Sequence, residues 1–140
     1  MKLIAIAFET ANEQRGSACS VGLAWIENGR VTRVVERLIR PKEMRFSSFN
    51  IAIHGIRPEH VEDAVVFPEV MDEFADDFCG ATMIAHNASF AFSVWRACLD
   101  QYRQSYHALQ YICSVQLAKY VWPHPSSHTF NVLALYLGLS

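Results

Sequence analysis

The sequence has few cysteines, and their spacing gives them no evident structural role. Cys19, Cys79, Cys98 and Cys113 form no Cys-x-x-Cys pair, and no histidine completes a zinc-finger spacing. This pattern argues against a disulfide framework and against a structural zinc site. It predicts buried, reduced thiols that pack as small hydrophobic side chains.

Long apolar runs and linkers are also missing. No stretch approaches the ~20 apolar residues that cross a bilayer, and no small-residue cleavage site of a signal peptide follows the short apolar start. We therefore expect a cytoplasmic protein without a membrane segment. There is no repeat, low-complexity tract or linker rich in Pro, Gly or Ser. With 51% hydrophobic residues, residues 1–140 are expected to form one domain.

An excess of positive charge is absent as well. The chain has 12 Lys and Arg against 14 Asp and Glu, a formal net charge of -2. Proteins that coat duplex DNA usually have a basic face, so any contact with nucleic acid should be confined to a cleft. The one basic stretch, residues 33–45, fits either a track for phosphates or a solvated strand edge.

The first third of the chain predicts three strands in an antiparallel meander. Residues 2–8 form a nearly continuous apolar run, as in a central strand that is covered on both faces. Residues 19–25 alternate between large apolar and smaller side chains. Asn28-Gly29 is typical of a hairpin turn, and residues 31–39 form the returning strand before Pro41.

From residue 67 onward the pattern is mainly helical. The spacing of apolar residues predicts helices over 67–78, 89–104, 115–121 and 129–137, with Ser89 as an N-cap, and short strands at 82–85 and 111–113. The acids of the first helix indicate a solvated face more than a metal cluster. This succession predicts an α/β fold, a mixed five-stranded sheet with helices on both faces, as in the ribonuclease H-like architecture.

Two strand ends have the form of a metal site that has lost its carboxylates. Ala7-Phe8-Glu9-Thr10 ends the first strand, and residues 86–91, His-Asn-Ala-Ser-Phe-Ala, follow the fourth. Two-metal hydrolysis needs several carboxylates around cations roughly 3.5–4 Å apart. Residues two apart on a strand share a face, so Asp at position 7 would join Glu9. Ala7 and Ala91 occupy the positions where carboxylates are expected.

Around these positions the sequence resembles the DEDD-type 3′–5′ exonucleases related to DNA-polymerase proofreading subunits, in the branch that uses a catalytic histidine. The resemblance covers essentially the whole chain. It rests on Phe-Glu-Thr at 8–10, Ile-His-Gly-Ile at 53–56, His-Asn-Ala-Ser-Phe at 86–90, Ser-Ser-His at 126–128 and Leu-Gly-Leu at 137–139.

The resemblance implies a role for each matching residue. Glu9 matches a metal ligand and catalytic residue, and Ala7 and Ala91 stand where the family has metal-binding Asp. Mg²⁺ or Mn²⁺ is the family's cofactor, and we expect its binding to be weak or absent here. The matching substrate-binding positions, around the 3′-terminal nucleotide, are Phe8, Thr10, His54, Asn87 and Phe90.

The family's third motif, a His followed five positions later by Asp, is expected after residue 139. The domain is therefore expected to be C-terminally truncated, with apolar surface exposed along Val132, Leu135 and Tyr136 and a tendency to self-associate. His128 has Leu133 five positions later and is not that His.

Several interpretations stay open at this point. His54 fits a turn as well as a substrate contact, His86-Asn87 fits loop hydrogen bonding, and Ala7 and Ala91 fit ordinary core alanines. The favoured function is an exonuclease domain that has lost its metals, from a lineage that releases nucleoside monophosphates from DNA or RNA 3′ ends. The alternatives are a non-catalytic module that binds single-stranded nucleic acid or a protein such as a polymerase, and an engineered or structural variant with neither property.

Overall fold

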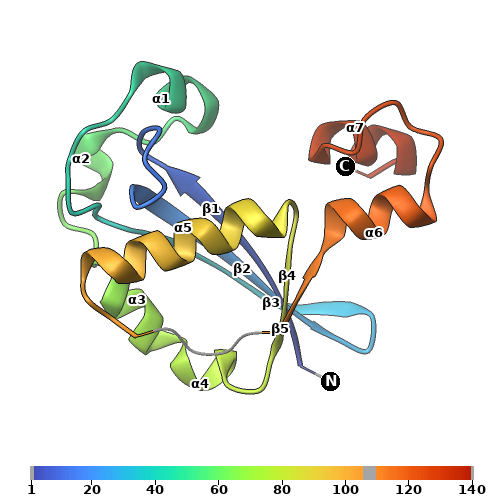
Figure 1. Cartoon of the computed structure of the whole chain (residues 1–140), viewed down its shortest axis with the longest axis horizontal. Helices are drawn as coiled ribbons and strands as arrows, with labels where there is room; N and C mark the ends of the chain where they lie inside the picture. The colour runs from blue at the N-terminus through green and yellow to red at the C-terminus, as the bar shows by residue number, and fades with distance from the viewer. Residues whose placement is uncertain (1, 106–109, 140) are drawn as a thin grey trace.

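The sheet begins with an antiparallel meander and continues with two parallel strands. The computed structural model describes residues 2–105 and 110–139. Its strands are β1 (Leu3–Thr10), β2 (Ala18–Glu27), β3 (Arg30–Leu38), β4 (Thr82–Ala85) and β5 (Gln110–Cys113), in the sheet order β3-β2-β1-β4-β5. β1 pairs antiparallel with β2 and parallel with β4 (Figure 1). The predicted mixed five-stranded sheet is confirmed.

The predicted hairpin turn is also confirmed. Asn28 and Gly29 join β2 to β3 with φ angles of 51° and 75°. Only glycine, and to a lesser degree asparagine, adopts positive φ readily, and a tight hairpin turn requires it.

Seven helices connect or follow the strands in the described part of the chain. They are α1 (Ser48–His54), α2 (Pro58–Val61), α3 (Phe67–Glu73), α4 (Ala75–Phe78), α5 (Ala88–Gln101), α6 (Ser114–Val121) and α7 (Phe130–Leu137). α6 and α7 lie close to their predicted positions. The two short helices α1 and α2 were not predicted, because Gly55 and Pro58 interrupt any longer periodic pattern.

Two helix predictions were wrong in detail. The helix predicted over 67–78 is broken at Phe74, whose ψ angle is 12° and whose fully buried ring packs 5.8 Å from that of Trp25. The break lets Phe74 and Phe78 both reach the core. Ser89 is not the N-cap of α5, since Asn87 occupies that position in the left-handed conformation, and α5 ends at Gln101.

The main core lies on one face of the sheet. Ile4, Ile6 and Phe8 of β1 stand beside Val21, Leu23 and Trp25 of β2 through the strand pairing, and they belong to one buried cluster or pack against it. α3, α4 and α5 cover this face with the aromatic residues Phe67, Phe74, Phe78, Phe92 and Trp95.

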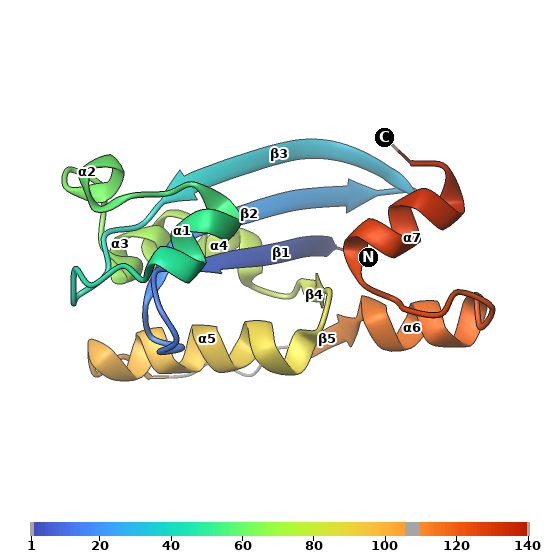
Figure 2. The same cartoon turned by 90° about the horizontal axis from the view of Figure 1, so that it is seen from above.

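The opposite face of the sheet is less covered. It carries Ala5, Ala7 and Glu9 of β1, and Val34 of β3 is 72% exposed there. Figure 2 shows α1 on this side toward the carboxyl end of β1 and α7 on this side toward its amino end. Helices therefore lie on both faces, as predicted, but one face has much the larger core.

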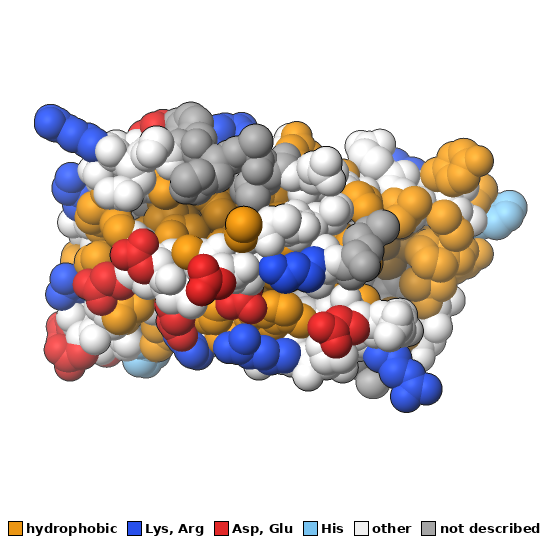
Figure 3. Space-filling view, turned by 90° about the horizontal axis from the view of Figure 1, so that it is seen from below, with side chains coloured by type: hydrophobic (Ala, Val, Ile, Leu, Met, Phe, Trp, Pro, Cys, Tyr) orange, Lys and Arg blue, Asp and Glu red, His pale blue; other side chains and the backbone are white. Residues whose placement is uncertain are grey.

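The acidic residues of α3 and α4 form a solvated face, as predicted. Figure 3 shows acidic side chains interspersed with Lys and Arg on this side of the molecule. Glu73 pairs with Arg37 at 2.7 Å and Asp77 with Arg33 at 3.8 Å. Two arginines of the basic stretch are therefore already paired with acids. This supports the interpretation of residues 33–45 as a solvated strand edge rather than as a track for phosphates.

Two other predictions concern the thiols and the membrane. Cys19 and Cys98 are buried, as predicted, but Cys79 is exposed and Cys113 is half-buried; all four thiols are free. Within the described ranges, no helix combines the length and the apolar character required to cross a membrane.

Candidate active site

The two segments that resemble the family's motifs, residues 7–10 and 86–91, meet at one edge of the sheet. β1 and β4 run parallel in the register Leu3 to Thr82 and Ala5 to Ile84, so their carboxyl ends point the same way. Glu9 and Thr10 end β1, and α5 begins three residues after β4 and contacts β1. Ligand sites of open α/β sheets form at this kind of edge.

The residues present do not fit a two-metal centre. Glu9 and Ala7 are exposed on the same face of β1, whereas Ala91 is only 6% exposed and belongs to the main core. Mg²⁺ requires oxygen ligands in near-octahedral geometry, and a methyl group supplies none. Among the residues described, no group of three or more His, Cys, Asp or Glu could hold a metal ion. Glu9 is the one carboxylate within residues 7–10 and 86–91.

Phe8 lies on the other side of the strand from Glu9. Its ring is 6.3 Å from those of Phe67 and Trp95, within the core side of the sheet. Because neighbouring strand residues point to opposite faces, only the backbone of Phe8, and not its ring, is available to a ligand on the face of Glu9.

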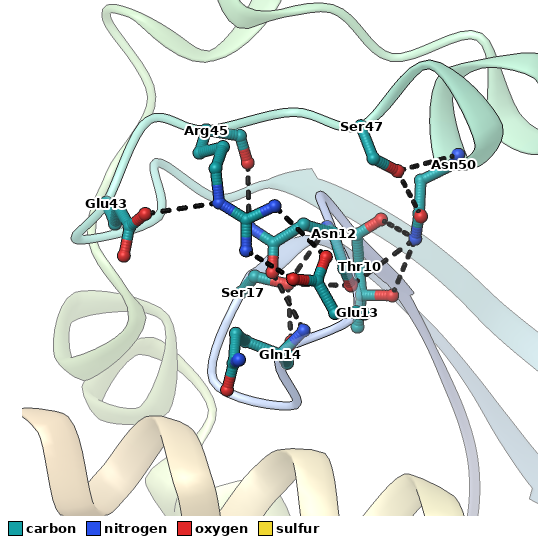
Figure 4. A network of polar contacts seen from close by, with 9 residues as sticks. All are labelled: Thr10, Asn12, Glu13, Gln14, Ser17, Glu43, Arg45, Ser47 and Asn50. Carbon is teal, nitrogen blue, oxygen red and sulfur yellow. Dashed lines mark hydrogen bonds and ion pairs between the residues drawn. The ribbon is translucent and has the colours of Figure 1, made fainter.

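Thr10 is held by two side chains from α1. Asn50 Nδ2 donates to the Thr10 carbonyl at 3.0 Å and to its hydroxyl at 3.3 Å, and His54 Nε2 lies 2.9 Å from the same carbonyl (Figure 4 shows Asn50 and Thr10). The Ile56 N–H donates to His54 Nδ1 at 2.9 Å, so Nε2 must carry the proton. Both ring nitrogens of His54 are therefore engaged within the chain, which agrees with the turn interpretation.

Asn50 was missed from the sequence. Ser47 caps α1 by accepting from the Asn50 N–H at 3.1 Å. A Ser followed three residues later by a polar amide was the available signal, since it resembles a capping box. Nothing local, however, indicated that the Asn50 side chain reaches back to β1.

The loop from residue 11 to residue 17 is cross-linked by its own polar groups (Figure 4). Buried Asn12 donates to the Arg45 carbonyl at 2.7 Å and accepts from the Gln14 N–H at 2.8 Å. Arg45 forms two hydrogen bonds with Glu13, which lower the pKa of the Glu13 carboxyl and raise that of the guanidinium. The loop that follows Thr10 is thus fixed by many contacts.

The first turn of α5 presents the remaining predicted residues. Asn87 is exposed, with a φ angle of 63°, and its side-chain oxygen accepts from the Ser89 hydroxyl at 3.4 Å. Phe90 is 39% exposed, and the Arg15 guanidinium lies 5.5 Å from the centroid of its ring. Both residues are therefore accessible to a ligand at this edge.

His86 connects three segments. Its Nδ1 lies 3.0 Å from the Ser114 hydroxyl, its Nε2 lies 2.7 Å from the His128 carbonyl, and its ring stacks 4.2 Å from that of Phe130. These contacts support the interpretation of His86 as a loop anchor. His128 in turn contacts the Trp122 carbonyl at 2.7 Å.

Cys113 lies beside this edge, between the start of α5 and the start of α6. The Ala88 N–H donates to its sulfur at 3.4 Å. Burial alone would raise the pKa of the Cys113 thiol, but hydrogen bonds from backbone N–H groups, including that of Ala88, outweigh it and lower the pKa. No local sequence pattern predicts this environment, because it forms from two separate helix starts.

Comparison with known proteins agrees with this geometry. Residues 7–140 match the family model described as Exonuclease. The PolC-type DNA polymerase III of Streptococcus thermophilus is 25% identical over 116 residues, 82% of this chain and 8% of that protein. The DNA polymerase III subunit epsilon of Salmonella typhimurium is 40% identical over 55 residues, 39% of this chain and 20% of that protein. The chain thus spans only a small part of these curated relatives.

Solved structures share the fold. The nuclease domain of 3′hExo, a DEDDh family member bound to rAMP, aligns with a TM-score of 0.84 at 16% identity, covering 99% of this chain and 80% of that one. Exonuclease X in complex with 5′ overhanging duplex DNA aligns with a TM-score of 0.77 at 23% identity, covering 99% and 74%. At these identities the structural likeness establishes the architecture.

Proposed function

Because the chain belongs to the DEDD-type 3′–5′ exonuclease family, we propose that it is an exonuclease domain that no longer hydrolyses phosphodiesters. The observation that carries the proposal is the pair of alanines, Ala7 and Ala91, beside the single carboxylate of Glu9. In the family the metals activate water and stabilise the leaving oxygen. One carboxylate does not organise two divalent cations, so neither role can be filled at this edge.

We further propose that the domain retains affinity for a single-stranded 3′ end without metal. The support is the exposed apolar surface of the two helices at the carboxyl end of β1. Phe49 and Ile53 of α1 are 74% and 66% exposed, and Phe90 of α5 is partly exposed. Exposed aromatic side chains bind unpaired bases by stacking. DNA and RNA are both candidates, and a polymerase or another nucleic-acid-processing protein is a candidate partner.

The test combines calorimetry with a nuclease assay. Mn²⁺ is titrated into the protein with and without an oligo(dT) that carries a free 3′ hydroxyl, and release of nucleoside monophosphate is followed. We expect no heat from Mn²⁺ alone, no product, and binding of the oligonucleotide in chelator. Product formation, or Mn²⁺ binding without the oligonucleotide, would contradict the loss of the metal site.

A gain-of-carboxylate variant tests the geometry of the site. Ala7→Asp places a second carboxylate on the face of Glu9, where two such charges 4 Å apart repel by up to about 4 kcal/mol at an effective dielectric of 20, and by much less when exposed. We expect a melting temperature lowered by a few degrees in chelator and recovered in Mn²⁺. Thr32→Asp adds the same charge at the far end of the sheet and should show no recovery. Equal responses of the two variants would argue against a shared site.

A further inference from the structure

The side chain of Arg15 lies along α5 and places its guanidinium near the start of that helix, on the side of the candidate site. The Cys98 sulfur lies 4.0 Å from the Arg15 carbonyl, which places the backbone of this loop residue beside the second half of α5. Its side chain runs toward the start of the helix, where Nη1 donates to the Ser93 hydroxyl at 2.6 Å and the guanidinium lies over Phe90. Both of these partners, the Ser93 hydroxyl and the Phe90 ring, are uncharged.

The arginine and the aromatic ring together form a surface suited to a nucleic-acid strand. Phe90 directly precedes Ala91, in the first turn of a helix of 14 residues whose positive end favours anions. A guanidinium beside an exposed aromatic ring combines the two features by which proteins bind single strands: a cation for the phosphates and a flat face for the bases.

The surroundings of the loop indicate which way a strand would run. The cavity beside this loop is lined by three acids, Glu13, Glu43 and Asp100, and by two arginines, Arg15 and Arg45. Arg45 is already paired with Glu13 and Glu43. The acids disfavour a chain of phosphates inside this cavity, whereas Ser93 and Phe90, which Arg15 contacts along α5, carry no negative charge.

We propose that Arg15 binds a backbone phosphate of a single strand whose 3′ end lies at Glu9 and Thr10, with Phe90 stacked on a base. This assignment rests on the proposed metal-free binding of a 3′ end. Where the carboxylates no longer hold cations, the Arg15 guanidinium supplies positive charge to the phosphates.

The experiment measures binding of 5′-fluorescein-labelled oligo(dT) to the full chain by fluorescence anisotropy, in chelator and over a range of salt concentrations. We expect Arg15→Gln to raise Kd about tenfold and to reduce the salt-dependence slope by about 0.7, the value of one single-strand phosphate. Arg15→Lys should keep the slope and lose only part of the affinity, because an ammonium retains the charge but not the planar fork.

Arg96→Gln is the matched control. It removes the same charge from an exposed position of α5 that lines a different cavity, with Met71 and Trp95, and both Kd and slope should stay near wild type. Equal weakening by Arg15→Gln and Arg96→Gln would overturn the assignment of Arg15. Binding of polyglutamate as tight as that of oligo(dT) would overturn it too, because the surface would then suit an acidic protein.

If the proposed metal-free binding of a 3′ end is itself wrong, the result is different, because the wild-type protein would then not bind oligo(dT) at all. Melting temperatures in chelator show whether each variant is folded. If Arg15→Gln does not fold, Phe90→Leu removes the stacking face and leaves the Arg15–Ser93 contact in place. It should weaken binding about tenfold, as expected for one stacked base, and unchanged affinity would refute the proposal.

Discussion

Ala7 and Ala91 occupy matching positions of the two motifs but lie in different surroundings. Ala7 is exposed on the open face of β1, whereas Ala91 is buried among apolar side chains that include Phe92 and Trp95. A carboxylate at position 7 would stay hydrated, and one at position 91 would lose water. Alanine thus avoids electrostatic repulsion with Glu9 at position 7 and avoids the desolvation of a carboxylate at position 91.

Ala91→Asp should therefore destabilise the protein by about 1–3 kcal/mol in chelator. Burial raises the pKa of the introduced carboxyl above its unfolded value of about 3.9. The part of the penalty that comes from ionising the carboxyl is then absent below a pH of about 3.9. It grows as the pH rises through the pKa that this carboxyl has in the folded protein. Urea denaturation at acidic and neutral pH measures it. Ser89→Asp, exposed in the same helical turn, should be neutral or slightly stabilising; equal penalties at both positions would refute the argument.

The cysteines should differ in reactivity. Burial raises the pKa of Cys19 to about 12 and that of Cys98 to about 11, while backbone hydrogen bonds lower the pKa of Cys113 below 9.0. The thiolate is the reactive species, so Cys113 should be alkylated by iodoacetamide at a lower pH than Cys19 and Cys98. Peptide mass spectrometry of the folded protein over a pH series gives the order. Labelling of Cys19 or Cys98 before Cys113 would contradict the structure.

At the scale of elements, α1 positions the end of β1. The helix is short and has no fully buried residue, yet Asn50 and His54 both reach the Thr10 carbonyl from successive turns. Such a helix has little stability of its own, so its hydrogen bonds to the strand hold both elements in place. Glu9 precedes Thr10 and depends on the same contacts for its position.

Asn50→Ala removes this connection. We expect a loss of about 1–3 kcal/mol, because the Thr10 carbonyl loses one donor and the Ser47 hydroxyl loses its acceptor Asn50 Oδ1. Equilibrium unfolding in urea measures the loss. Asn131→Ala, at an exposed position of α7, is the matched control and should change stability by less than about 0.5 kcal/mol. A loss of stability in Asn131→Ala as large as that in Asn50→Ala would contradict a specific stabilising role of the contact between Asn50 and Thr10.

At the scale of the whole molecule, apolar surface is concentrated at the end formed by α6 and α7. Tyr120 and Leu135 are 87% and 83% exposed, and Phe130 and Tyr136 are also exposed. Figure 3 shows hydrophobic side chains gathered at the α6 end of the molecule. The expected exposure of Leu135 and Tyr136 is confirmed, while Val132 is only partly exposed. We propose that residues 1–140 fold as one domain around the main cluster and that this end promotes self-association.

The prediction is a weight-average mass that rises with protein concentration in sedimentation equilibrium. Leu135→Lys should weaken the association, because a charge in an apolar contact must be desolvated. Ile53→Lys changes an exposed apolar residue of α1, toward the opposite end of β1, and should leave the association unchanged. A wild-type mass independent of concentration, or equal effects of the two variants, would argue against the α6–α7 end as the contact.

Local patterns in the sequence were sufficient for the strands, the Asn28-Gly29 turn and the placement of both motifs. Alternation, turn chemistry and helical spacing act over a few residues, so the sequence displays them directly. By itself the sequence also determined that positions 7 and 91 carry no ligand.

The tertiary structure decided the rest. It placed Ala91 in the core and Ala7 outside it, broke the predicted helix at Phe74, and joined His54 to the Thr10 carbonyl. It also placed Arg15 against Phe90. Each of these depends on which distant segments pack together, and that choice is made by burial and hydrogen-bond satisfaction over the whole molecule.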